Sequence, residues 1–116
     1  MNLKMIMALV KDDITQTVID AAREKGATGA TIITSAQGEG LIKEKTFLGL
    51  DLAAQRDIVI FLVAEPLARD ILEAIGEAGK FDEEPGAGIA CQISLEDAVG
   101  MTTQLPTLKN EVEKEI

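Results

Sequence analysis

A chain of 116 residues is long enough to bury one hydrophobic core and too short for two. Its 47% hydrophobic and 27% charged residues are typical of a folded globular protein. The net charge of −9 argues against nucleic-acid binding, and the absence of histidine removes the commonest general base and metal ligand. The longest apolar run is too short to span a bilayer and no signal peptide is recognisable, so we expect a cytoplasmic protein without membrane insertion.

The first part of the chain predicts a strand, a helix and a second strand. Residues 3–10 are an apolar run of strand length. Apolar residues then recur at helical spacing, and we expect Asp12 or Asp13 to cap the start of this helix and Gly26 to end it. Residues 27–35 (ATGATIITS) are rich in β-branched side chains, which favours a strand.

The second part repeats this order. Residues 56–65 (RDIVIFLVAE) predict a third strand, and Pro66 suits the first turn of a helix. The inner face of that helix would carry Leu67, Ile71, Leu72 and Ile75. Residues 89–94 (IACQIS) predict a fourth strand, with Cys91 buried in it, and residues 95–100 (LEDAVG) predict a short helical turn.

The order β-α-β-β-α-β predicts an α+β protein of the ferredoxin-like type, with a four-stranded antiparallel sheet and both helices on one face. We expect other subunits to cover the second face of this sheet. Residues 103–116 form a separate tail, in which Thr107 would cap a short helix. Its apolar face would carry Leu108, Val112 and Ile116.

A long stretch between the second and third strands fits neither a helix nor a strand. Compact domains rarely contain such a loop unless it is functional. Its segment KEKTFLGLD mixes charged and apolar side chains, which suits a loop that orders on contact with a partner. The candidate partner-binding residues are Lys43, Lys45, Phe47 and Leu48. A simple connector, or a loop packed on its own oligomer, is the alternative.

Several segments in this order resemble the PII signal-transduction proteins and their PII-like relatives over residues 3–102. They are GATGATII, GEG, the long loop, RDIVIFLVAEPLARDILEAI, a glycine-rich loop and LEDAVG. The resemblance implies a domain over residues 1–102 that forms homotrimers, is not an enzyme, and binds adenine nucleotides between subunits. It implies that residues 41–55 are the effector loop (T-loop), which contacts a partner such as a membrane transport protein. Because the chain has no tyrosine, the family's tyrosine modification is excluded.

The resemblance also implies a nucleotide site. Thr31 would face adenine, Arg56 would contact phosphate, and residues 79–89 would correspond to the B-loop of the neighbouring subunit, whose glycines offer backbone N–H groups to phosphates. The complete set of implied ligand-binding residues is Thr31, Gly38, Glu39, Gly40, Arg56, Gly86, Ala87 and Gly88.

This sequence departs from the family pattern at basic positions. Ile89, Gly100 and Thr102 stand where the family has phosphate-binding lysine and arginines, and Ile42 replaces a glutamine. Each charge-assisted hydrogen bond to phosphate contributes about 1.5–3 kcal/mol, so three losses would severely weaken ATP binding. Acidic residues 82–84 would repel polyphosphate further. We therefore do not expect strong binding of ATP. The ligand could be AMP, ADP or another less charged molecule, or the protein could bind no nucleotide.

Other functions are weaker matches to the sequence. A trimeric scaffold or metal-tolerance protein of the same fold would need no nucleotide, and residues 82–84 could offer carboxylates to a hard cation. The glycine pairs could also be plain turns. We expect no enzymatic activity, because no nucleophile–base pair and no metal-ligand spacing is present.

Overall fold

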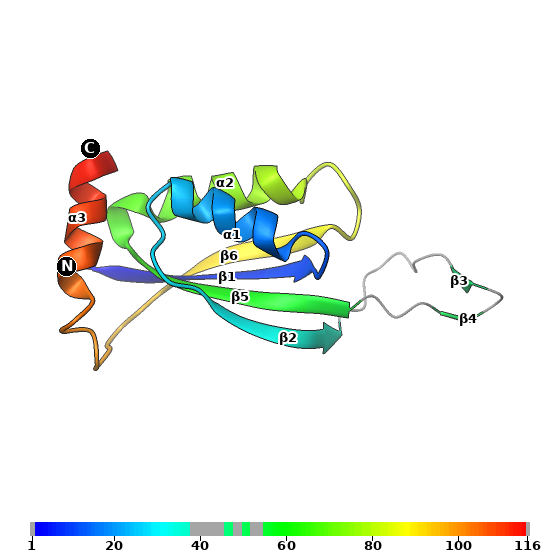
Figure 1. Cartoon of the computed structure of the whole chain (residues 1–116), viewed down its shortest axis with the longest axis horizontal. Helices are drawn as coiled ribbons and strands as arrows, with labels where there is room; N and C mark the ends of the chain where they lie inside the picture. Colours follow the sequence, from blue (N-terminus) through cyan, green and yellow to red (C-terminus); the bar gives the residue numbers. More distant parts are fainter. Residues whose placement is uncertain (1, 38–45, 48–49, 52–54, 116) are drawn as a thin grey trace.

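The computed structural model describes residues 2–37, 46–47, 50–51 and 55–115. Its main sheet contains β1 (Leu3–Lys11), β2 (Thr31–Gln37), β5 (Gln55–Ala64) and β6 (Gly88–Ser94). The strand order is β2-β5-β1-β6, and all neighbouring strands are antiparallel. Helices α1 (Thr15–Glu24) and α2 (Glu65–Gly79) lie together on one face of this sheet (Figure 1). The predicted α+β fold, with its βαββαβ order and antiparallel sheet, is confirmed.

The hydrophobic core lies between this sheet and the two helices. Successive strand residues point to opposite faces, so every second side chain of β1 and β5 is buried against the helices. The largest fully buried side chains here are Ile6, Val10, Val18, Val59, Phe61, Val63, Ile71 and Ile75. Pro66 occupies the first turn of α2 as predicted, and Leu67 is also buried, whereas Leu72 is only partly buried.

The other face of the sheet, which we call the open face, has no helix over it (Figure 1). It is nevertheless apolar, and its half-buried residues on the two central strands are Met5, Met7, Leu9, Ile58, Ile60 and Leu62. Ile33, Ile89 and Ile93 on the edge strands are 47%, 66% and 43% exposed. Cys91 lies opposite Met7 on this face and is exposed, so its predicted burial is wrong for the single chain.

Helix α1 does not use the predicted cap. Its N-cap residue is Ile14, which makes no side-chain capping bond, and both Asp12 and Asp13 are exposed in the preceding turn. The cap position is Ile14 because the chain makes a further turn after Asp13, in which the N–H of Ile14 donates to the carbonyl of Lys11, and the side chain of the first helical residue, Thr15, donates to Asp57 of β5. The helix stops before Gly26, whose φ of 107° suits the predicted end.

The C-terminal tail forms helix α3 (Leu105–Glu115), at the end of the sheet that also holds the N-terminus (Figure 1). Leu108 is 2% exposed, so this helix is anchored by a buried side chain. Thr107 lies within α3 rather than capping it, since the N–H of Leu105 already donates to the carbonyl of Met101. Residues 95–100 form irregular bends and not the predicted helical turn.

Two short strands lie within the predicted effector loop (residues 41–55). β3 (Thr46–Phe47) and β4 (Leu50–Asp51) pair in antiparallel fashion, which corrects the expectation of a loop without strands. A strand of two residues is too short to show the alternation of polar and apolar residues by which strands are recognised in a sequence. The pair lies beyond the end of β2 and the start of β5, away from both helices (Figure 1). Lys43, Lys45 and Leu48 lie outside the described residues.

Candidate functional site

The glycine loop, residues 79–89, connects the end of α2 to β6. Lys80 follows the helix in the left-handed conformation, with φ of 55°. Its carbonyl accepts a hydrogen bond from the N–H of Glu84, whose own carbonyl accepts one from the N–H of Ala87. The loop is therefore an internally bonded turn, and the N–H of Ala87 is directed into it.

Two positions of this loop require glycine, for different structural reasons. Gly86 has φ of 75°, a backbone conformation that residues other than glycine adopt only with strain. Gly88 allows close packing, since a Cβ there would lie 2.5 Å from the carbonyl oxygen of Leu9 and 2.6 Å from the ring of Phe81. Local structure accounts for both glycines, whether or not a ligand binds beside them.

Arg56 joins the glycine loop to the strand that follows the effector loop. It is the second residue of β5, it is 7% exposed, and its Nη2 donates a 2.8 Å hydrogen bond to the carbonyl of Gly86. We expected the glycine loop to reach Arg56 from a neighbouring subunit, but the two already touch within one chain. A ligand at this loop would lie next to a guanidinium group that the fold holds in place.

Lys11 is a basic residue of this region that the sequence analysis missed. The register of β1 and β5 places it directly opposite Arg56. It also lines an open hollow of about 240 Å³, shared with Lys80, Ala87, Asp13 and Glu84. Its position next to Arg56 follows from strand register, which the sequence pattern alone does not give.

A buried polar pair lies next to Arg56 along the chain. Thr15 Oγ1 donates a 2.6 Å hydrogen bond to Asp57 Oδ2, and both residues are at most 9% exposed. Thr15 is the first residue of α1, so this hydrogen bond joins the start of the helix to β5. Neither residue was singled out from the sequence, because 42 positions separate them.

Thr31, another predicted ligand-binding residue, does not join this group within one chain. Thr31 is exposed at the far end of β2, opposite Ile60, whereas it is Ala36 that pairs with Arg56. At about 3.3 Å per residue, Thr31 lies roughly 15 Å along the strand from that point. β2 and β6 are also opposite edges of the sheet. Residues 38–40 (Gly38, Glu39 and Gly40) lie outside the described residues.

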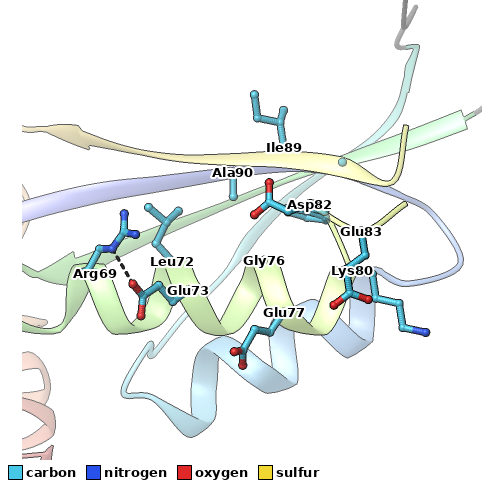
Figure 2. A pocket seen from close by; sticks show the side chains of 12 residues that line it. Arg69, Leu72, Glu73, Gly76, Glu77, Lys80, Asp82, Glu83, Ile89 and Ala90 are labelled. Carbon is cyan, nitrogen blue, oxygen red and sulfur yellow. Dashed lines mark hydrogen bonds and ion pairs between the residues drawn. The ribbon is translucent and has the colours of Figure 1, made fainter. Parts of the chain in front are cut away.

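A larger hollow, of about 400 Å³, lies between α2 and β6 (Figure 2). Its charged lining consists of Arg69, Lys80, Glu73, Glu77, Asp82 and Glu83, and Arg69 is already paired with Glu73 at 2.9 Å. Ala90 points toward the helix in this view, while Ile89 points away from it. Four carboxylates against two cations make this hollow unsuitable for a phosphate group.

Comparison with models of known protein families identifies the family of this chain. The model of the nitrogen regulatory protein P-II family matches residues 3–104. The chain belongs to this family. P-II proteins are signalling proteins rather than enzymes, they bind nucleotides and they typically form trimers. The identification agrees with the resemblance seen in the sequence.

Solved structures of P-II relatives share the fold. A PII-like signalling protein from Thermus thermophilus is 23% identical, with a TM-score of 0.60 over 81% of this chain and 87% of that one. CPII from Thiomonas intermedia, solved with ADP, AMP and acetate, is 19% identical, with a TM-score of 0.59 over 83% and 90%. No curated protein sequence matches the chain. The identities of 23% and 19% to these two structures are those of a divergent member of the P-II family.

Neither a membrane-spanning helix nor a cluster of metal ligands is found among the described residues of this P-II protein. No described helix combines the length and the apolar character needed to cross a membrane. Residues 82–84, which we considered for a hard cation, belong to no metal-binding group of three or more candidate ligands in the described part of the chain.

Proposed function

We propose that this P-II protein is a non-enzymatic cytoplasmic regulator that senses an adenine nucleotide and controls a partner through its effector loop. The hydrogen bond from Arg56 Nη2 to the carbonyl of Gly86 carries the proposal. It connects the glycine loop to the second residue of β5, immediately after the effector loop. A ligand bound at the glycine loop would shift the populations of effector-loop conformations, and about 1–3 kcal/mol of differential contacts would be enough for regulation.

The charge of this region supports a ligand with few phosphates. Arg56, Lys11 and Lys80 offer positive charge near the glycine loop, and Asp13 and Glu84 oppose it. A nucleoside triphosphate carries about four negative charges, which this set would not neutralise. ADP and AMP are better matched, and the structural neighbour CPII was solved with both of them.

The fold supports a site between subunits of a homotrimer. The glycine loop and Thr31 are on opposite edges of one sheet, so a site that uses both requires a second copy. The contact between two different edges is heterologous, and such contacts form a closed ring when the rotation between successive subunits closes. Covering the open face in the same assembly would remove Ile33, Ile89 and Ile93 from water, which is favourable. The regulated partner would be a membrane transport protein or a metabolic enzyme that the effector loop contacts.

Calorimetric titration of the purified protein with AMP, ADP, ATP and cyclic AMP, with and without magnesium, tests nucleotide sensing. We expect saturable binding of ADP or AMP at one site per subunit, and weaker binding of ATP. Arg56→Gln should weaken ADP binding by about 10- to 100-fold, the effect of one charge-assisted hydrogen bond. If none of the four nucleotides binds, nucleotide sensing is contradicted and the scaffold alternative is favoured.

Light scattering on the same samples tests the assembly. We expect a particle of three times the 12.4 kDa subunit mass. Ile93→Glu, on the open face, should break it into monomers. Val99→Glu is the matched control, because Val99 is 95% exposed and lies outside the sheet. A monomeric wild-type protein would rule out a site between subunits.

A further inference from the structure

Three polar side chains are buried in the part of the chain that the structure describes, and they lie together. They are Thr15, Arg56 and Asp57, at 8%, 7% and 9% exposure. Burying a charged group costs free energy unless its partners compensate, so such a cluster requires an explanation. The proposed sensing uses Arg56 directly but gives no role to Thr15 and Asp57.

The two neighbours on β5 contact different parts of the molecule. Consecutive strand residues point to opposite faces, and the register pairs Asp57 with the buried Val10 and Arg56 with Lys11. Asp57 is thereby anchored to α1 through the 2.6 Å hydrogen bond from Thr15, while the side chain of Arg56 reaches Gly86. The backbone of β5 is held at its first residues from the helix side, next to the effector loop.

We propose that Thr15 and Asp57 are positioning residues that hold Arg56 at the glycine loop. Through Arg56 they set the affinity for the phosphate part of a nucleotide. This inference rests on the proposed function, because it concerns the same Arg56. Its physical basis is that Arg56 lies only one residue inside the strand, where a strand end frays unless neighbouring contacts hold it. The short bond between Thr15 and Asp57 supplies such a contact, in addition to the strand pairing of Arg56 with Lys11 and Ala36.

Thr15→Val and Thr15→Ser test the inference as a matched pair. Valine keeps the shape of threonine without the hydroxyl, and serine keeps the hydroxyl without the methyl group. Binding of ADP and of adenosine is measured by calorimetry for both variants and for Arg56→Gln. We expect Thr15→Val to weaken ADP binding about tenfold. This is a part of the 10- to 100-fold loss expected when the charged hydrogen bond itself is removed in Arg56→Gln. Adenosine binding should change less than about twofold, and Thr15→Ser should restore ADP binding.

Two results would overturn the positioning role. Equal weakening of ADP and adenosine would show that the hydrogen bond serves the fold in general. Unchanged ADP binding in Thr15→Val, alongside a loss in Arg56→Gln, would show that Arg56 keeps its place without the anchor. Circular dichroism at the titration temperature confirms that each variant is folded.

A second readout separates this inference from the proposed function. Hydrogen exchange of the amides in residues 86–88 reports on the contact of Arg56 with Gly86 without any ligand. If the wild-type protein binds no nucleotide, the sensing proposal fails. Faster exchange at these amides in both Thr15→Val and Arg56→Gln would still support the positioning role. Unchanged exchange in Thr15→Val would overturn it.

Discussion

The two ends of the sheet are closed by opposite kinds of chemistry. At the end where β5 stops, α3 and the chain before it bury Leu108 and Met101, two apolar side chains. At the end where β5 starts, the buried side chains include Thr15, Arg56 and Asp57, held by directional hydrogen bonds. Figure 1 shows α3 at one end, with the glycine loop and the strands of the effector loop at the other.

The difference indicates where stability and function reside. Apolar burial is favourable in proportion to area and needs no fixed geometry, so the α3 end can stabilise the fold without specifying a site. Polar burial is costly unless every group finds a partner, and it persists where a defined geometry is needed. Changes at the α3 end should therefore alter stability alone, and changes at the polar end should alter ligand binding as well.

The largest effect is expected for Leu108→Ala at the apolar end. Removing a buried leucine side chain costs about 2–5 kcal/mol, because the site only partly collapses around the cavity. Thermal denaturation should show a fall in melting temperature of roughly 8–20 °C. Affinity for ADP should remain unchanged in the folded protein. Glu113→Ala, at an exposed position of the same helix, should shift stability by less than about 0.5 kcal/mol. A large loss of ADP affinity in Leu108→Ala would break the division between the two ends.

The sequence predicts the apolar parts of the molecule better than the polar end. Alternating or continuous apolar residues indicated the four strands, and helical spacing indicated both core helices, because burial imposes these periods. The polar end depends on strand register and on contacts across 42 residues, which no local pattern contains. The same limit explains two errors. Asp12 and Asp13 matched the rule for a local cap, and Cys91 matched a buried strand although its face of the sheet is open.

A smaller effect is expected for Gly86→Ala at the polar end. The φ of 75° would place alanine in the left-handed region, at a cost of about 1–2 kcal/mol. The new Cβ would lie 3.9 Å from Arg56 Nη2, an ordinary contact, so backbone strain rather than a clash is the cause. We expect lower stability in thermal denaturation and weaker ADP binding, because the loop would relax away from Arg56.

Gly76→Ala is the matched control for this glycine. It lies within α2, and a Cβ there meets nothing within 4 Å. Alanine is favoured over glycine in a helix by about 0.5–1 kcal/mol, so this variant should be stabilised with unchanged ADP affinity. If Gly86→Ala kept full stability and affinity, the backbone of the glycine loop would not be part of the functional end.

The smallest effect is expected for substitution of Lys80 by glycine. Unlike Leu108→Ala and Gly86→Ala, this change should increase stability. Lys80 has φ of 55° at the C-terminal end of α2, where glycine is the preferred residue. Lys80→Gly should therefore raise the free energy of unfolding by up to about 1 kcal/mol. Lys80→Ala removes the same charge but keeps the strained backbone. If Lys80 contributes positive charge to the site, both variants should weaken ADP binding equally, while only glycine gains stability. Equal stability of the two variants would show that the left-handed conformation costs this loop nothing, and unchanged ADP binding in both would limit the basic site to Arg56 and Lys11.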